Sequence, residues 1–339
     1  MNSTTMRGGC HRPMKVWNQA INIWICSLIL LSWAIGVQKG LAQETESDTS
    51  ASAPQLIVLG VAQDAGFPQA GCMKVCCQKA WDEAEARRHP VSLAIVDPTT
   101  QQRWMLDCSP AFPDQWKLLN EQHPVSNVPG LDGILLTHAH MGHYLGLAYL
   151  GREVIGAKQV PVYAMPRMAT FLAKNGPWDQ LVRLGNIELK GLKADQSIQL
   201  NSRLSVTPIL VPHRDEYSET VGFIVRGPAR SCLYLPDIDK WDRWDRSIIE
   251  LVRDVDIAFL DGTFFADGEL PGRNMSEIPH PFIRESMAWF SKLSRDDRNK
   301  IRFIHFNHTN PVLQESSTAA DQIREAGFNL AQQGENHEL

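Results

Sequence analysis

The stretch LLTHAHMGHYLG, residues 135–146, is the part of the sequence that indicates the fold. His138, His140 and His143 follow an apolar run, residues 134–136, that is typical of a buried strand. The three imidazoles therefore leave the end of that strand together. Neutral imidazole is a preferred ligand of zinc and of similar transition metals. Three histidines on one turn thus predict a metal site, whereas a single histidine would more often be a core or surface residue.

Other residues that could bind a metal follow later β runs. His213 and Asp237 come directly after two such runs, residues 204–211 and 231–235, and His305 lies in a third. Taken alone, each has an ordinary explanation as a surface histidine, a turn aspartate or a histidine on the polar face of a strand. Their common placement at strand ends, after a three-histidine motif, favours a single joint site.

The motif resembles the H-x-H-x-D-H signature of the metallo-β-lactamase superfamily, except that Gly142 stands in place of the aspartate. This resemblance implies an α+β fold, the four-layered αββα sandwich known as the metallo-β-lactamase fold. It also implies the role of each ligand. A first ion would be bound by His138, His140 and His213, and a second by His143 and His305, with Asp237 bridging the two. Asp107, at the end of an earlier strand, resembles the superfamily's aspartate that orients the ligand turn.

Gly142 leaves the second ion short of a carboxylate. We therefore expect one tightly bound zinc ion and a weaker second one, with iron or manganese as alternative metals. Replacing Gly142 by aspartate is predicted to raise the metal occupancy. If another residue completes the second position, Asp215 is the first candidate.

The hydrophobic pattern agrees with such a sandwich, because strand runs alternate with helices in two successive sets. Strands are predicted at 55–60, 92–96, 103–106, 130–136, 160–164, 187–192, 197–200, 204–211, 220–225, 231–235, 257–260 and 301–306. Helices are predicted up to residue 86 and at 112–120, 146–151, 167–174, 248–252, 282–293 and 319–326.

Within the superfamily, residues 55–335 resemble two branches: the pyrroloquinoline quinone biosynthesis protein B family and the phosphodiesterase of phosphonate catabolism. In the phosphodiesterase branch, an acidic residue on a late strand and a downstream histidine supply a proton to the leaving group. Asp261 and His280 stand at those positions. The alternative for His280 is a loop histidine between two prolines, since one pairing by analogy is a weak signal.

The cysteines resemble those of the same phosphodiesterase only in part. That branch has a structural zinc held by three cysteines and a histidine. Cys72, Cys77 and His308 match its pattern, but Lys74 replaces the middle cysteine and Cys76 is additional. Because adjacent residues point apart on a strand or turn, we expect Cys76 and Cys77 not to bind the same ion. A disulfide among Cys72, Cys76 and Cys77 is an equal alternative in an oxidising compartment.

The N-terminal part of the chain has the features of an export segment. Lys15 precedes the apolar run 21–37, and small residues follow it, which predicts a signal peptide or an uncleaved N-terminal anchor over residues 1–42. Residues 43–54 are polar and predict a disordered linker. The catalytic domain is then 55–339, and either form of the leader places it outside the cytoplasm, in the periplasm or the extracellular space.

Composition limits the partners of this domain. The 339 residues are 43% hydrophobic and 21% charged, which suits one globular catalytic domain. The net charge of −5 and the lack of a basic stripe argue against nucleic acid as a partner. A small substrate, including an anionic one, is compatible with this charge. Contact with a membrane is expected only through an uncleaved N-terminal segment.

These observations predict a metal-dependent hydrolase in which a metal-bound hydroxide attacks an ester or phosphodiester of a small substrate. One alternative is an oxidoreductase like the quinone biosynthesis protein, using iron at the same site. Export counts against it, because cofactor assembly of that kind is usually cytoplasmic. The other alternative, motivated by Gly142, is a non-catalytic metal-binding protein.

Overall fold

Two seven-stranded sheets form the centre of the protein in a computed structural model that describes residues 52–339. The predicted leader, residues 1–42, and most of the predicted linker lie outside the described residues. The first sheet contains, in spatial order, β14 (Asn336–Glu338), β1 (Gln55–Gly60), β2 (Ser92–Asp97), β3 (Gln102–Leu106), β4 (Gly133–Leu135), β5 (Val160–Ala164) and β6 (Ile187–Gly191). The second contains β13 (Asn329–Leu330), β12 (Ile301–Ile304), β11 (Ile257–Asp261), β10 (Ser231–Leu235), β9 (Val221–Arg226), β8 (Ser205–Leu210) and β7 (Ile198–Gln199).

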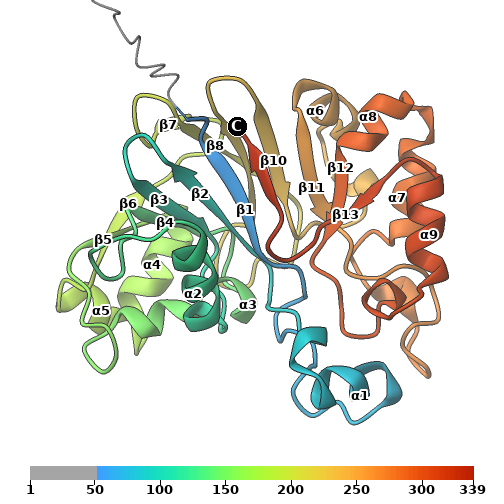
Figure 1. Cartoon of the computed structure of the whole chain (residues 1–339), viewed down its shortest axis with the longest axis horizontal. Coiled ribbons are helices and arrows are strands. Elements are labelled where there is room, and N and C mark those ends of the chain that lie inside the picture. The colour runs from blue at the N-terminus through green and yellow to red at the C-terminus, as the bar shows by residue number, and fades with distance from the viewer. Residues whose placement is uncertain (1–51) are drawn as a thin grey trace, which may run out of the picture. The chain divides into compact units, whose positions relative to one another are not determined.

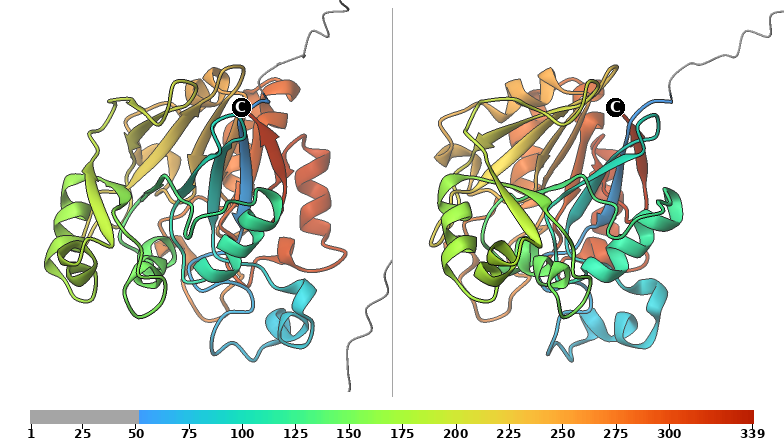
Figure 2. Two further views of the ribbon diagram at one scale, coloured as in Figure 1. Left: turned by 60° about the vertical axis from the view of Figure 1, so that its left-hand side comes forward. Right: turned by 90° about the vertical axis from the view of Figure 1, so that its left-hand side faces the viewer.

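Helices cover the outer face of each sheet, so the predicted αββα sandwich is confirmed (Figure 1). The first sheet carries α2 (Phe112–Gln122), α3 (Met141–Tyr144), α4 (Pro166–Lys174) and α5 (Trp178–Arg183). The second carries α6 (Ile248–Asp254), α7 (Ile283–Trp289), α8 (Arg295–Lys300) and α9 (Thr318–Glu325). The segment with α1 (Val75–Asp82) projects from the end of the sandwich at which β1 ends (Figures 1 and 2).

The core explains why the strands read as continuous apolar runs. Leu56 and Val58 of β1 pack between the two sheets, while Ile57 and Leu59 pack under the helices of the first sheet. Side chains alternate across a strand, so a strand in the middle of four layers must be apolar on both faces. Among residues 52–339, no helix is long and apolar enough to cross a bilayer.

Most predicted elements are found within one or two residues of their expected bounds. Two predicted helices end four residues early as α-helices, at Asp82 instead of 86 and at Trp289 instead of 293, and each is followed by a 3₁₀ turn. The predicted strand 130–136 is only three residues long in the structure, because the chain leaves the sheet to present the histidines. The predicted helix 146–151 is a 3₁₀ helix, Leu145–Leu150, that follows directly on α3. The short elements α3, α5, α8, β13 and β14 were not predicted.

Strand direction gathers the functional residues at one edge. In the first sheet β1 and β3 are both antiparallel to β2, and β4 is parallel to β3. In the second sheet β8 and β10 are both antiparallel to β9, and β10, β11 and β12 are parallel. The carboxyl ends of β3, β4, β8, β10, β11 and β12 carry Asp107, His138, His213, Asp237, Asp261 and His305, in that order.

Candidate metal centre

The three-histidine turn folds as its spacing predicts. Beyond β4, His140 takes an extended conformation and α3 begins at Met141, which brings His143 back beside the first two histidines. The ring centroid of His138 lies 4.4 Å from that of His140 and 4.2 Å from that of His143. The three imidazoles therefore converge on one region.

The later candidate ligands join this region in two groups. Potential ligand atoms of the first group lie within 4.8 Å of one another, and its members are His138, His140, His213 and Asp237. In the second group, Nε2 of His143 and Nε2 of His305 lie 3.2 and 3.3 Å from Oδ2 of Asp237. The other oxygen, Oδ1, lies 3.7 Å from Nε2 of His213. The Asp237 carboxylate thus contacts both groups, as a bridging ligand would.

Most of the candidate ligand atoms are buried without hydrogen bonds, and the exception is Nε2 of His140, which lies 3.4 Å from a carboxylate oxygen of Glu216. Among the described residues, Nε2 of His138, His143, His213 and His305 and Oδ2 of Asp237 have no hydrogen-bond partner of normal geometry. An unpaired buried polar group costs about 1–3 kcal/mol. So many unpaired atoms facing one point fit a bound cation, which would satisfy all of them together.

Asp107 holds the ligand turn at the end of β3. Its carboxylate accepts hydrogen bonds from the Thr137 backbone N–H and hydroxyl, both at 2.8 Å, and from the Tyr234 hydroxyl at 3.0 Å. It also lies 2.8 Å from Nδ1 of His143. Because Nδ1 is engaged in this way, Nε2 of His143 is left to face Asp237. The structure thus places Asp107 where the sequence predicts an orienting carboxylate.

Asp261 has the equivalent position at the end of β11. It accepts hydrogen bonds from the Thr263 hydroxyl at 2.7 Å and the Ile238 backbone N–H at 3.1 Å. The Thr263 hydroxyl lies 2.9 Å from Nδ1 of His305. Oδ2 of Asp261 lies 2.7 Å from Nδ1 of His280. One carboxylate therefore positions both a candidate ligand and the candidate proton donor.

His280 lies at the rim of the centre. Its ring centroid is 5.1 Å from that of His213 and 6.0 Å from that of His305. Burial would lower the pKa of His280, but the adjacent Asp261 carboxylate outweighs burial and raises the pKa above its usual value. The interpretation of His280 as an isolated loop histidine does not fit this placement.

The candidate ligands differ in their protonation. Burial lowers the pKa of His138, His140 and His305, which keeps these imidazoles neutral as metal binding requires. Burial acts in the same direction on His143, but Asp107 and Asp237 raise its pKa well above the ordinary value. A proton on His143 must therefore leave before Nε2 can bind an ion.

Two carboxylates at the centre were not predicted from the sequence. Oδ1 of Asp239 lies 3.4 Å from Nδ1 of His213. Asp64, in the loop after β1, has Oδ1 3.7 Å from Nε2 of His143 and groups with His143 and His305. The predicted candidate, Asp215, is wrong, because its exposed carboxylate pairs with Arg167 at 3.1 Å. A strand-end position was the only signal that could have identified Asp64.

The cysteine cluster also differs from the prediction. Cys76 and Cys77 both approach Nδ1 of His308, at 3.8 and 3.4 Å, and Cys72 Sγ lies 3.7 Å from Cys76 Sγ. All four ligand atoms lie within 4.8 Å of one another, and the cysteines are free thiols. The premise that the side chains of Cys76 and Cys77 point apart is wrong, because both belong to α1, where successive side chains are about 100° apart rather than opposite. The position of Cys76 fits that of a third cysteine ligand, which the sequence pattern lacks at Lys74.

A cavity of about 310 Å³ adjoins the metal centre at His280. Two arginines, Arg214 and Arg273, and one carboxylate, Glu277, line it together with the polar side chains of Gln63 and Asn307, so its charged groups are positive in sum. The charge of Arg214 reaches the centre, where it contributes to the lowered pKa of His140. This cavity can therefore take a small anion beside the ligand groups.

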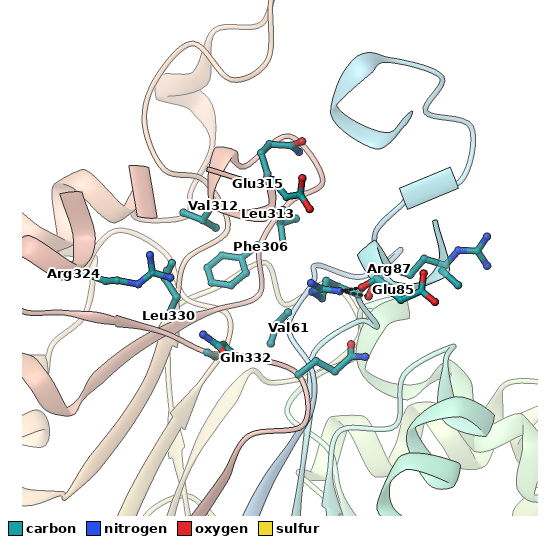
Figure 3. Close-up of a pocket in the computed structure, with 15 residues that line it drawn as sticks. Val61, Glu85, Arg87, Phe306, Val312, Leu313, Glu315, Arg324, Leu330 and Gln332 are labelled. Carbon is teal, nitrogen blue, oxygen red and sulfur yellow. Dashed lines mark hydrogen bonds between the residues drawn. The ribbon is translucent and has the colours of Figure 1, made fainter. Parts of the chain in front are cut away.

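A second cavity, of about 610 Å³, lies between the segment after β1 and the segment after β12 (Figure 3). Val61 and Arg87 line one side, and Phe306 and Leu313 the other. None of the predicted metal ligands lines it.

Comparison with known proteins gives one consistent result. The family profile described as "Beta-lactamase superfamily domain" matches residues 102–306, more than half of the 339-residue chain. Coenzyme PQQ synthesis protein B of Xanthomonas axonopodis pv. citri is 26% identical over 306 residues, which cover 83% of this chain and 98% of the relative.

Solved structures show the same fold. Zinc-bound PqqB from Methylobacterium extorquens has a TM-score of 0.70 at 22% identity and covers 84% of this chain and 100% of its own. A diphosphatase from the PhnP family has a TM-score of 0.58 at 21% identity and covers 85% and 98%. These matches confirm the resemblance of the sequence to the metallo-β-lactamase superfamily and to its two branches.

Proposed function

The chain belongs to the beta-lactamase superfamily, and on this basis we propose that it is a zinc-dependent hydrolase of a small anionic ester or phosphodiester. The observation that carries the proposal is the placement of His280, a candidate proton donor, at the rim of a cluster of histidine and aspartate ligands. A bound zinc ion lowers the pKa of a coordinated water and so supplies a nucleophile near neutral pH. The rest of the chemistry falls to the side chains of the protein.

His280 supports the leaving-group step. Expulsion of an alkoxide is unfavourable unless a proton reaches its oxygen, and general acids contribute about 10²- to 10⁴-fold to such steps. The 2.7 Å contact with Asp261 orients the imidazole and favours its protonated form. His280 also lines the 310 Å³ cavity, so a group bound there lies beside it.

Arg214 and Arg273 support an anionic substrate. A guanidinium binds phosphate or carboxylate oxygens through paired hydrogen bonds. Both side chains are exposed at the cavity and, among residues 52–339, neither forms an ion pair. The volume of about 310 Å³ lies at the lower end of the range for small-molecule pockets.

A second candidate is the iron-using oxidoreductase related to the quinone biosynthesis protein. The 26% identity to Coenzyme PQQ synthesis protein B over nearly its whole length favours it. Two histidines with a carboxylate, as in His143, His305 and Asp237, also suit non-haem iron. The two candidates differ in their reaction: the zinc form would hydrolyse an ester, whereas the iron form would oxidise its substrate.

The test is turnover by purified protein loaded with zinc or with iron(II). We expect the zinc form to hydrolyse small phosphodiesters, to lose this activity on chelation and to regain it with zinc. Lactam and thioester substrates are the comparison. Failure of every ester in the zinc form would contradict the proposal.

We also propose that the domain is exported, on the basis of the apolar segment 21–37. Mass spectrometry of protein from the native host is expected to show an N-terminus at Gln43. An intact Met1 in a membrane fraction would identify an anchor instead.

A further inference from the structure

We propose that Asp64 supplies the carboxylate of a second metal position, with His143 and His305, in the space that Gly142 leaves open. The inference concerns metal binding and does not depend on the reaction. It replaces the expectation of one tight and one weak ion by two tightly bound ions at the histidine centre.

The loop after β1 is fixed beside the second group of ligands. Gln63 N–H donates to the Phe306 carbonyl at 2.8 Å, and Phe306 N–H donates to the Val61 carbonyl at 2.8 Å. These two hydrogen bonds join the loop to the residue that follows His305. The position of Asp64 is therefore set by the same strand end that delivers a ligand.

Asp64 and Gly142 fit each other closely. The Gly142 backbone N–H donates to Oδ1 of Asp64 at 3.0 Å. A Cβ atom on Gly142 would lie 2.4 Å from Cα and 2.5 Å from Oδ1 of Asp64. An aspartate at 142 and the observed Asp64 cannot occupy this space together. The carboxylate that the superfamily motif carries is thus supplied from a different strand end.

The carboxylate of Asp64 faces the remaining ligands. Oδ1 lies 3.7 Å from Nε2 of His143, and potential ligand atoms of Asp64, His143 and His305 all lie within 4.8 Å of one another. With the shared Asp237, the second position then has two histidines and two carboxylates, while the first has three histidines and Asp237. Four ligands in each position are what a tightly held zinc ion requires.

The experiment counts zinc by mass spectrometry after dialysis against a zinc buffer, and measures the affinity of each site by titration. Changes to residues that only orient a ligand typically lower metal affinity 10- to 100-fold. We expect Asp64→Asn, which removes a direct ligand, to weaken one ion by more than about 100-fold. The zinc count should fall by one per chain. Asp215→Asn, at the exposed carboxylate, is the control and should leave the count unchanged.

The melting temperature of the metal-free protein separates a ligand role from a packing role. Asparagine keeps the shape of the side chain and an oxygen that can accept from the Gly142 backbone N–H, so Asp64→Asn should leave this temperature unchanged while one ion is lost. Gly142→Asp is expected to lower it, because a Cβ atom would meet the backbone of the loop at Asp64. An unchanged zinc count and affinity in Asp64→Asn would overturn the proposal, and so would a loss of zinc that goes with a lower melting temperature of the metal-free form.

Discussion

Replacement of His280 by alanine tests the assignment of the proton donor. The imidazole is held 2.7 Å from the Asp261 carboxylate, which raises its pKa and favours its protonated form. The variant should therefore lose the full contribution of a general acid, about 10²- to 10⁴-fold. This loss should appear only for substrates whose leaving group needs a proton.

The assay compares an alkyl phosphodiester with a nitrophenyl phosphodiester on zinc-loaded protein. His280→Ala should slow the alkyl substrate by the factor above and the nitrophenyl substrate far less, with zinc content unchanged. His123→Ala, a change at a half-buried histidine whose backbone carbonyl accepts from Arg103, is the control. Equal slowing of both substrates would refute the acid role, and loss of zinc would make His280 a ligand.

The pH profile gives an independent check of the same residue. Hydrolysis of the alkyl substrate should fall as the pH rises through the raised pKa of His280, because the donor loses its proton. Asp261→Asn removes the carboxylate that raises this pKa, so the fall in the rate of hydrolysis should occur at a lower pH. Each unit of displacement corresponds to about 1.36 kcal/mol of lost interaction. A fall at the same pH in Asp261→Asn as in the unaltered protein would show that Asp261 does not act through His280.

Three further outcomes follow from the geometry. Zinc should be retained at high pH and released as the pH falls through the raised pKa of His143, because a proton then competes with the ion for Nε2. Metal analysis after dialysis across a pH series measures this release. Cys77→Ser should remove one zinc from the cysteine cluster and lower the melting temperature, whereas Cys108→Ser, at a buried cysteine outside the cluster, should not change the zinc count. Arg214→Ala should raise KM for an anionic diester with little change in kcat, and steady-state kinetics that show an unchanged KM would exclude a contact with substrate.

Much of the fold could be predicted because its strands are buried on both faces. Leu56 to Leu59 pack alternately into two different cores, and that requirement gives the apolar runs from which the strands were located. The short helices α5 and α8 have too few residues to show a helical period. Strands β13 and β14 have two and three residues and are defined by their pairing partners rather than by their own pattern.

The residues of the metal centre, too, could be predicted only in part from the sequence. His138, His140 and His143 are close in sequence, so their convergence could be predicted from local spacing. Asp64 is 78 residues from Gly142, and only the packing of two strand ends brings them together. The sequence shows that Gly142 lacks a carboxylate but not which loop replaces it. For Cys76, the error came from treating a helical turn as extended chain.

The most direct test of the proposed hydrolase is hydrolysis of a small phosphodiester by the zinc-loaded protein in ¹⁸O-labelled water. Hydrolysis requires that one oxygen from water enters each product phosphate and that no dioxygen is consumed. We expect one ¹⁸O per turnover, with this incorporation lost when zinc is removed and restored when zinc returns. No labelled product from the zinc form, together with dioxygen consumption by the iron form, would contradict it.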